Sequence, residues 1–443
     1  MEVRAVADLS PAERQALFSR DAGIDAVRED VEEIASRVRE EGDAALREYA
    51  RELDGVEVGA IEITDDAERA VETIDDDLQG AIETAIGNVK QFHERQLPDD
   101  WRAEFGRREL GRRFRPLSRV GAYVPGGKAA YPSSAVMTVV PATVAGVERV
   151  VVTTPPGDPP NPATLAAISL AGADAVYVAG GAQAVAALAY GTETVSPVEK
   201  IVGPGNRWVT AAKAAVRDDV AIDFLAGPSE VCVLCDESAD PRFVAADLLA
   251  QAEHDPRASV VAVTDDVDLA DEVVTEIERT VGERGRTETI ESALSNDASG
   301  VFRTRSMSEA VAFCEEYAAE HLSIQAAQDE ALLERISNAG SVFLGPCTPV
   351  AAGDYASGTN HVLPTGGGAR VTGGLSVDSF LRATTVQRLS ADALADLGGT
   401  IDTLARAEGL EAHTESVAVR LREYAETETE TTASDDEGER LRE

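Results

Sequence analysis

Apolar residues recur with a helical period over the first hundred residues. Between residues 25 and 55 charged residues separate the apolar positions, which are Val27, Val31, Ile34, Val38 and Leu46. This spacing is close to the 3.6-residue period of a helix that buries one face. A second helical pattern runs from Asp66 to Gln96. The pattern therefore predicts a mostly helical N-terminal region.

From about residue 115 the pattern changes to short, mainly apolar runs that alternate with helical segments rich in small residues. The runs are RVGAYV, RVVVTT, AVYVAG, VEKIV, VCVLC and SVVAVT. Strands that are apolar on both faces are typical of parallel sheets covered by helices. Serial β-α-β units of this kind predict an α/β fold with doubly wound parallel sheets.

The C-terminal third is less regular. Residues 346–374 form a long stretch rich in Gly, Thr and Pro, and such loops in compact enzymes are usually functional. Residues 376–389 are compatible with a strand or a short helical connector, and 392–424 with two helices. Residues 426–443 are mostly Glu and Thr, which predicts a disordered tail.

The stretch from Ile222 to Pro256 contains an unusual concentration of site-like features. A Gly-Pro turn carrying Ser229 precedes the apolar run VCVLC, and a helix follows. Asp240 before Pro241 is a strong helix start, because Asp caps the free N–H groups and Pro fits the first turn. Gln251 and His254 stand three residues apart near the helix end, so their side chains share one face.

The charge balance excludes some partners. The net charge is −40, from 80 acidic and 40 basic residues, and only four of the basic residues are Lys. This predicts adaptation to a salty cytoplasm, where the repulsion is screened; an ordinary acidic protein is the alternative. No nucleic-acid binding is expected, because it needs a basic surface.

No membrane association is expected either. No apolar run reaches the roughly 18 residues that a membrane span needs. The N-terminus carries early acids and no apolar segment of the signal-peptide type, so a cytoplasmic location is expected.

The four Cys do not suggest a metal site or a disulfide. Cys232 and Cys235 have the spacing of half a zinc ribbon, but no second pair exists. Residues three apart in a strand point to opposite faces. Buried, reduced thiols are therefore the better interpretation of this pair.

The five His are the next candidates for chemistry. His93 lies in a polar helical segment and is expected at the surface. The other four, which lie in polar or turn-forming segments, are His254, His321, His361 and His413.

Zinc accepts N, O and S ligands, and several sets are possible. Gln251, His254, Asp354 and His413 form one of them. Alternatively, Gln251 and His254 cap a helix end and Asp354 forms an Asx turn.

Proton transfer has one candidate pair, Glu320 and His321. Neighbouring helical residues do not share a face, so the two side chains meet in one cleft only at an element end or turn. There they offer two bases of different pKa. A surface Glu-His on an acidic helix is the alternative.

Three Gly-rich turns are candidates for nucleotide binding. They contain Tyr123, Gln183 and Asn206, and each follows a predicted strand and precedes a predicted helix. A pyrophosphate or ribose can bind at such turns. Each turn alone is a weak signal, but three along one sheet edge predict a binding crevice.

These segments together resemble the histidinol dehydrogenase family. The resemblance runs from about residue 115 to 420 through RVGAYVPGG, VAGGAQAVAALAYGTETV, KIVGPGNRWV, AGPSEV, ADLLAQAEHDP, AAEHLSI, GDYASGTNHVLPT and AEGLEAHTESVAVR. Trp208 and Thr359 depart from the expected pattern.

The resemblance implies oxidation of L-histidinol to L-histidine through L-histidinal in two hydride transfers, with NAD and one Zn²⁺ per subunit. It implies that Gln251, His254, Asp354 and His413 bind the metal and contact substrate, and that Glu320 and His321 are the acid–base pair. It further assigns Ser229, His321, His361 and Glu408 to the substrate, and Tyr123, Gln183 and Asn206 to NAD.

The resemblance also implies a domain-swapped homodimer in which Glu408 and His413 cross to the neighbouring subunit. We expect two Rossmann-like domains, residues 21–122 with 230–374 and residues 123–229. We expect a small domain of residues 1–20 with 375–390, a swapped helical segment 391–425, and the tail 426–443.

Two other functions remain possible on the residues alone. One is a zinc hydrolase with Glu320 as the water base, which the Gly-rich turns disfavour. The other is a non-catalytic binding protein, which the complete set of ligands and bases disfavours. None of the Cys lies on a Gly-rich turn or beside a His, so hydration of an aldehyde fits better than a thiohemiacetal.

Overall fold

The computed structural model describes residues 1–20, 22–126 and 130–424. The predicted tail at 426–443 lies outside these residues. The chain divides into two compact units: Met1–Leu97 with Pro116–Leu381, and Pro98–Arg115 with the chain from Arg382 onward. No helix in the described ranges is long and apolar enough to cross a membrane.

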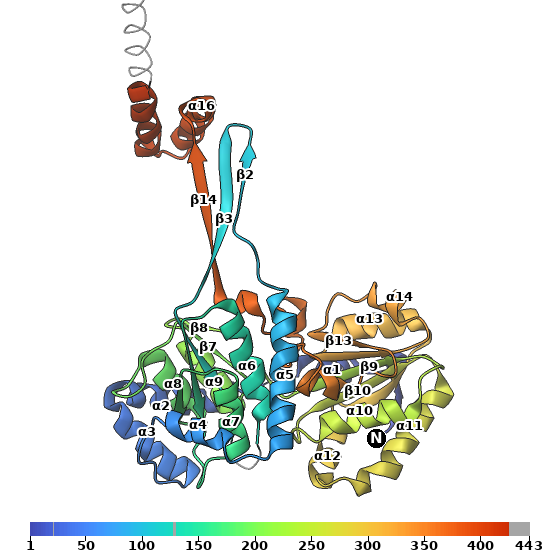
Figure 1. Cartoon of the computed structure of the whole chain (residues 1–443). Helices are drawn as coiled ribbons and strands as arrows, with labels where there is room; N and C mark the ends of the chain where they lie inside the picture. Colours follow the sequence, from blue (N-terminus) through green and yellow to red (C-terminus); the bar gives the residue numbers. More distant parts are fainter. Residues whose placement is uncertain (21, 127–129, 425–443) are drawn as a thin grey trace, which may run out of the picture. The chain divides into compact units, whose positions relative to one another are not determined.

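The first unit contains two parallel sheets (Figure 1). The six-stranded sheet has the order β1 (Val3–Ala5), β11 (Gly300–Arg303), β10 (Ser259–Thr264), β9 (Glu230–Cys235), β12 (His321–Gln325) and β13 (Ser341–Leu344). The five-stranded sheet has the order β6 (Ala175–Val178), β5 (Arg149–Thr154), β4 (Arg119–Tyr123), β7 (Lys200–Val202) and β8 (Ala221–Ile222). These sheets confirm the predicted doubly wound α/β class.

Helices cover both faces of the six-stranded sheet. The side chains of Val231, Val233 and Cys235 pack with α10 (Pro241–Ala252), α11 (Val267–Thr280) and α12 (Thr287–Leu294). Cys232 and Leu234 pack in the opposite layer with α1 (Pro11–Ser19), α13 (Met307–Tyr317) and α14 (Asp329–Leu333). Cys232 and Cys235 are therefore buried, free thiols on opposite faces, as predicted.

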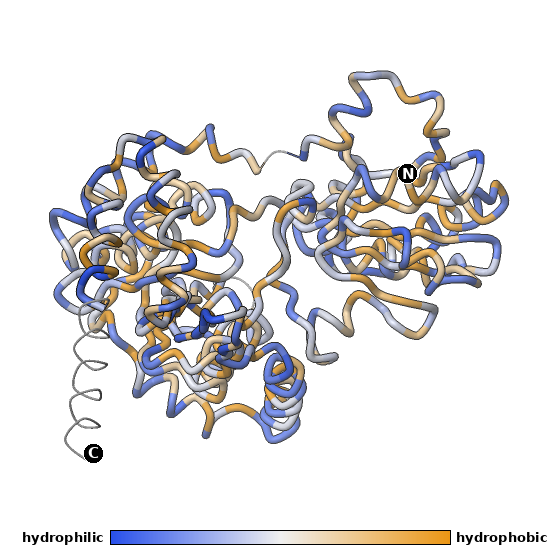
Figure 2. The backbone as a smooth tube through the Cα atoms, turned by 90° about the horizontal axis from the view of Figure 1, so that it is seen from above, coloured by the Kyte–Doolittle hydropathy of each residue, from blue (hydrophilic) through white to orange (hydrophobic). Residues whose placement is uncertain are grey.

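The five-stranded sheet is covered in the same way. One layer contains α4 (Thr64–Val71), α5 (Asp76–Glu94), α6 (Pro132–Ala145) and α7 (Pro162–Leu170). The other contains α2 (Arg28–Glu41), α3 (Asp43–Tyr49), α8 (Gly181–Tyr190) and α9 (Arg207–Val216). In the part of the first unit built on the six-stranded sheet, which contains the N-terminus, the polar segments lie mainly at the periphery (Figure 2).

His93 corrects one expectation. The side chain is fully buried, not at the surface, and its Nδ1 lies 2.7 Å from the backbone oxygen of Val89. The segment around it is polar, but His93 continues the buried stripe of α5 formed by Ile82, Ala85 and Val89. Position on the helix decided its burial, and the local composition did not.

The second unit contains a three-stranded sheet with the order β14 (Leu381–Leu389), β3 (Arg108–Pro116) and β2 (Trp101–Phe105). It also contains α16 (Ala391–Ala407) and a helical segment at 411–424. Residues 376–389 combine both sequence expectations, because a short 3₁₀ turn (Val377–Phe380) precedes β14.

Candidate active site

One cleft of about 1630 Å³ in the first unit gathers ten of the twelve residues singled out from the sequence. They are Tyr123, Gln183, Asn206, Ser229, Gln251, His254, Glu320, His321, Asp354 and His361. The other two, Glu408 and His413, belong to the second unit. The cleft therefore joins the candidate cofactor, metal and proton-transfer residues of the first unit.

Glu320 and His321 reach one cleft because they lie where a strand begins. Helix α13 ends at Tyr317, Ala318 adopts a left-handed conformation with φ 51°, and β12 starts at His321. Both side chains are buried, at 6% and 4% exposure. The pair is thus not a surface feature of an acidic helix.

Backbone contacts define the orientation of both side chains. Oε2 of Glu320 accepts a hydrogen bond from the backbone N–H of Glu230 at 2.8 Å. Nδ1 of His321 lies 3.0 Å from the backbone oxygen of Glu230. A carbonyl oxygen only accepts, so Nδ1 carries the proton, and Nε2 of a neutral His321 holds the free lone pair.

Nε2 of His321 is buried and lacks a hydrogen bond within the described residues, although Oδ1 of Asp354 lies 3.4 Å away. That contact has ion-pair distance without hydrogen-bond geometry, so it is electrostatic. Burial lowers the pKa of His321, but Glu320 and Asp354 outweigh it and raise the pKa to about 9. Burial raises the pKa of Glu320 to about 8, against the lowering effect of His321.

The oxygen and nitrogen donors come from two helices. Gln251 lies in the last turn of α10, which starts at Pro241 with an Asp240 cap as predicted, and His254 follows its end. Asp354 lies in α15 (Val350–Tyr355), and its backbone oxygen is 2.8 Å from Nδ1 of His361. That contact leaves Nε2 of His361 available to a ligand.

Asp354 is held as a carboxylate. Burial opposes ionisation, but contact with His321 outweighs it and keeps the pKa of Asp354 below its usual value. Within residues 1–20, 22–126 and 130–424, no group of three or more His, Cys, Asp or Glu forms a ready metal site. Gln251, His254 and Asp354 line the cleft, and no such group forms around them in the described ranges.

The three Gly-rich turns follow β4, β6 and β7 at the same sheet edge. The Tyr123 hydroxyl accepts from the backbone N–H of Gly181 at 3.2 Å, which joins the first turn to the second. Asn206 caps α9 through Oδ1, at 3.0 Å from the N–H of Trp208. The helices that follow direct their N–H groups toward this edge, as anion binding requires.

Two buried ion pairs support the cleft and were not singled out from the sequence. Lys213 pairs with Asp223 at 2.7 Å, and Arg20 pairs with Glu230 at 2.7 Å. The available signal was a charge inside an apolar segment, as at Lys213 in AAKAAV and Glu230 before VCVLC. Arg20 lies 210 positions from Glu230 and Asp223 lies 10 positions from Lys213, and a lone charge in an apolar segment does not say which residue it pairs with.

Comparison with known proteins decides the family. The sequence model described as histidinol dehydrogenase matches residues 18–421. The chain belongs to the histidinol dehydrogenase family. It is therefore an oxidoreductase of histidine biosynthesis that acts on histidinol.

Relatives of this family resemble the chain over nearly its whole length. Histidinol dehydrogenase of Haloarcula marismortui is 69% identical over 421 residues, covering 95% of this chain and all of that protein. The Methanosarcina mazei protein is 46% identical, covering 95% of this chain and 98% of its own. The crystal structure of histidinol dehydrogenase from Elizabethkingia anophelis has a TM-score of 0.89 at 36% identity, covering 96% and 98%.

Proposed function

We propose that this histidinol dehydrogenase family member oxidises L-histidinol to L-histidine through L-histidinal, with two successive hydride transfers to NAD. The supporting observation is that Glu320 and His321, two buried bases, line the same cleft as three Gly-rich turns. An alcohol-to-acid oxidation needs one base for the alcohol, a hydride acceptor, and one base for water.

In the first oxidation, Nε2 of His321 accepts the hydroxyl proton of histidinol while the carbinol carbon transfers its hydride to the first NAD. The bond to Glu230 keeps the proton of His321 on Nδ1, so Nε2 is the atom that acts as base. The products are the bound aldehyde, NADH and the protonated His321.

In the second oxidation, Glu320 accepts a proton from water as the water oxygen adds to the aldehyde carbon. The resulting hydrate anion transfers its hydride to the second NAD and gives the carboxylic acid, which releases its proton to become the carboxylate. Nearly complete burial favours this role, because a desolvated carboxylate is a stronger base than an exposed one.

We infer that Zn²⁺ is the metal of the site, one per subunit. Amide, carboxylate and imidazole donors suit it, and Gln251, His254 and Asp354 would hold it together with His413. When bound, zinc supplies a Lewis acid that holds the amine and imidazole of the substrate. Ser229, His321, His361 and Glu408 would contact the same substrate.

The residue roles are tested by measuring NADH formation and zinc content together. With histidinol and NAD, the wild-type enzyme should form two NADH for each histidine. His321→Asn should retain zinc and stop turnover, whereas His254→Ala should lose zinc. A metal-loaded wild-type enzyme that forms no NADH would exclude the dehydrogenase function and favour hydrolysis.

We further propose a domain-swapped homodimer in which Glu408 and His413 reach the partner's cleft. The second unit supports this, because it buries little by itself. All five residues of β2 are exposed, and Trp101 and Phe105 are each 44% exposed. Large apolar side chains left open in a small unit indicate a missing partner surface.

Mixing two inactive variants tests the swap. Glu320→Gln alters the first unit and His413→Asn the second. In a swapped heterodimer one site combines two intact units, so random mixing should recover about a quarter of wild-type activity. If both residues of a site come from one chain, every site carries a substitution and no activity returns.

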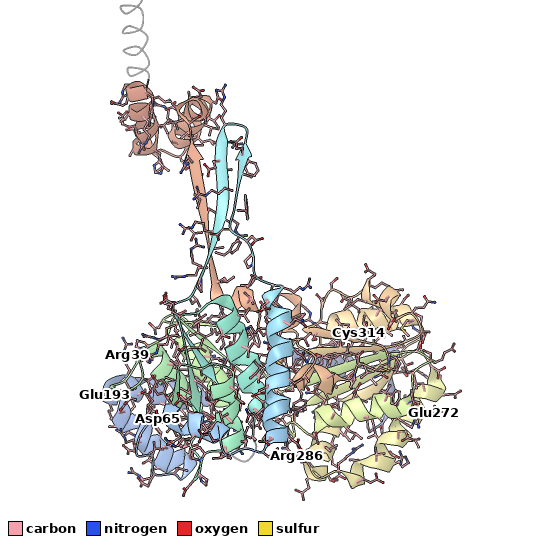
Figure 3. The ribbon with its side chains drawn as sticks, viewed as in Figure 1. Arg39, Asp65, Glu193, Glu272, Arg286 and Cys314 are labelled. Atoms are coloured by element: carbon pink, nitrogen blue, oxygen red, sulfur yellow. The ribbon has the colours of Figure 1, made fainter. Side chains whose placement is uncertain are left out.

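The chain is also proposed to work at high salt. The net charge of −40 supports this, and acidic side chains such as Asp65 and Glu272 are exposed (Figure 3). Cys314, labelled in the same view, is buried and carries no such charge.

A further inference from the structure

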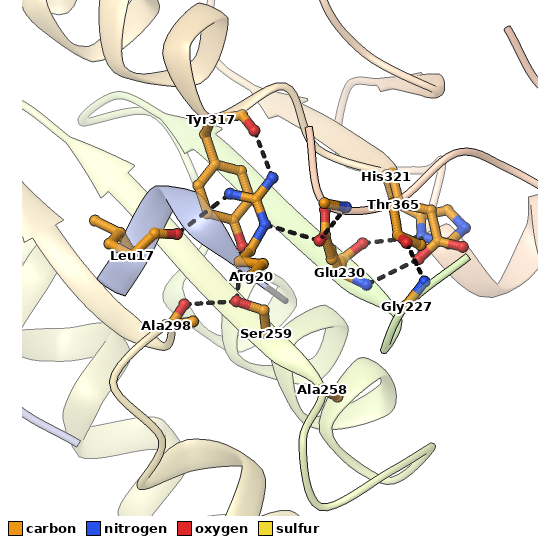
Figure 4. A network of polar contacts seen from close by, with 12 residues as sticks. Leu17, Arg20, Gly227, Glu230, Ala258, Ser259, Ala298, Tyr317, His321 and Thr365 are labelled. Atoms are coloured by element: carbon orange, nitrogen blue, oxygen red, sulfur yellow. Dashed lines mark hydrogen bonds and ion pairs between the residues drawn. The ribbon is translucent and has the colours of Figure 1, made fainter. Parts of the chain in front are cut away.

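Glu230 contacts both members of the proposed acid–base pair through its own backbone, and Figure 4 shows it beside His321. Its N–H donates to Oε2 of Glu320 at 2.8 Å, and its carbonyl oxygen accepts from Nδ1 of His321 at 3.0 Å. Small movements of this one residue therefore change the direction of both side chains.

The side chain of Glu230 is fixed in the protein interior. It is 2% exposed, and Oε1 accepts from Nε of Arg20 and from the backbone N–H of Gly366, each at 2.7 Å. Oε2 is buried and has no hydrogen bond within the described part of the chain. The carboxylate is thus held through one oxygen.

Arg20, in turn, cannot turn toward solvent. Its side chain is 4% exposed and donates to the backbone oxygens of Leu17 at 3.3 Å and Tyr317 at 2.6 Å. Its guanidinium lies 3.8 Å from the centre of the Tyr317 ring. Arg20 directly follows α1 and lies 210 positions before Glu230. The ion pair between them therefore connects the N-terminal segment to the site.

The neighbouring loop fixes the turn that precedes Glu230. The hydroxyl oxygen of Thr365 accepts from the N–H of Gly227 at 2.6 Å, and the next residue, Gly366, donates to Glu230. Ser229 lies between these two contacts and lines the cleft. The turn is therefore held at both ends.

Net stability is a weak explanation for this arrangement. A buried ion pair seldom stabilises a fold more than apolar residues of the same volume, because both charges lose their hydration. Here the ion pair holds Glu230, whose backbone is hydrogen-bonded to the side chains of Glu320 and His321. A displacement of about 1 Å in an active site can lower the rate by about a hundredfold.

We propose that Glu230, held by Arg20, is a positioning residue that aims Glu320 and His321 at the substrate. This inference rests on the acid–base roles proposed above for that pair. It assigns to Glu230 no contact with substrate, so its loss should affect turnover and leave binding intact.

Two substitutions test this proposal. Glu230→Gln keeps the side-chain volume and removes the charge that pairs with Arg20; Arg20→Met removes the cation and keeps the length of the stem. For each, we expect kcat for histidinol oxidation to fall about tenfold to a hundredfold, with KM for histidinol and zinc content within about twofold of wild type. The double variant should lose no more than the worse single variant, because both act through one contact.

Tyr317→Phe is the matched control in the same network. It removes only the hydroxyl, which donates to Oγ of Ser259 in β10 at 2.8 Å, and it keeps the ring beneath Arg20. We expect a lower Tm with a wild-type kcat. The contrast separates positioning from general loss of stability.

The outcomes are distinguishable from those of the proposed function. Wild-type kcat in folded Glu230→Gln, or a raised KM with unchanged kcat, overturns the positioning role. If Arg20→Met does not fold, Glu230→Gln decides alone. Wild-type turnover in Glu320→Gln and His321→Asn, measured in parallel, overturns the acid–base roles instead.

Discussion

At the scale of single residues, the buried carboxyl group of Asp247 connects the two helices that carry the proposed metal ligands. It lies in α10 and accepts from Nε2 of Gln325 at 3.1 Å and from the backbone N–H of Val350, where α15 begins. Burial raises the pKa of Asp247 to about 6, against the effect of these hydrogen bonds. The unfolded chain therefore releases this proton at lower pH than the folded protein.

Asp247 makes the folded protein less stable as the pH rises. Because the folded protein keeps the proton longer, the free energy of unfolding falls as pH rises from about 4 to about 6, by about 2–3 kcal/mol. Above that range the folded state carries a buried, ionised carboxylate. Stability contributed by Asp247 is thus present in acid and lost toward neutral pH.

Asp247→Asn should remove this loss. The amide oxygen still accepts from Val350. Where the new N–H₂ group replaces Oδ2, turning over the Gln325 amide brings its Oε1, which is buried without a partner in the described chain, to face it in place of Nε2. We expect a gain of about 1–3 kcal/mol near neutral pH that shrinks toward pH 5. Urea unfolding of both proteins across this range measures it; an equal difference at every pH would contradict the assignment.

At the scale of elements, the turn after β7 depends on one glycine. Gly203 has φ +113°, and a Cβ atom there would overlap the backbone oxygen of Tyr123. Lys213 and Asp223 hold the same turn, because Lys213 donates to the Gly203 oxygen and Asp223 accepts from the Gly203 N–H at 2.8 Å. The turn leads to Asn206 and α9, so its shape sets the proposed NAD side of the cleft.

Gly203→Ala should therefore weaken both stability and cofactor use. A side chain in this strained conformation, against a backbone atom, should cost about 2–4 kcal/mol and raise KM for NAD more than KM for histidinol. Gly80→Ala is the control: Gly80 lies inside α5 with open space around it, and Ala there should stabilise by about 0.5–1 kcal/mol. An unchanged KM for NAD in Gly203→Ala would separate this turn from the cofactor site.

Local patterns predicted those elements that bury their residues in a regular way. The apolar runs gave the parallel strands, and the Asp240–Pro241 signal gave the start of α10. The hairpin of β2 and β3 was missed although Trp101, Ala103 and Phe105 alternate with charged residues as in a strand; the run is only five residues long and follows a long helical region, so it did not stand out.

At the site, the sequence pattern mainly failed to predict contacts between residues that are far apart in the chain. Twelve candidate residues came from motifs, and ten of them line one cleft. The link between Arg20 and Glu230 spans 210 positions, so neither residue's neighbours in sequence indicate it. His93 failed for the opposite reason, because its polar neighbours concealed its place on a buried stripe.

At the scale of the whole molecule, the net charge of −40 has to be reconciled with a compact fold. Several of the described ion pairs with exposed partners join neighbours on one helix, as in Arg69–Asp66 and Arg406–Asp402. Such pairs contribute little each and leave the excess of acids unpaired. The mutual repulsion of those acids is long-range, and dissolved salt screens it.

Stability should therefore rise steeply with salt. Raising KCl from about 0.1 M to about 1 M shortens the Debye length from about 10 Å to about 3 Å, so Tm should increase over this range. Glu272→Lys gives the matched variant. Glu272 is exposed on α11 between Asp268 and Glu276, one turn away on either side, and the substitution replaces two repulsive pairs with attractive ones.

We expect Glu272→Lys to stabilise the protein by about 0.5–1 kcal/mol at low salt and to lose this advantage in molar KCl, because the same screening removes both effects. Thermal unfolding of the two proteins along one KCl series measures it. A gain that persists in molar KCl would assign the effect to helix propensity, since Lys and Glu would then differ without their charges. A Tm that does not depend on KCl would show that repulsion among the acids does not limit this fold.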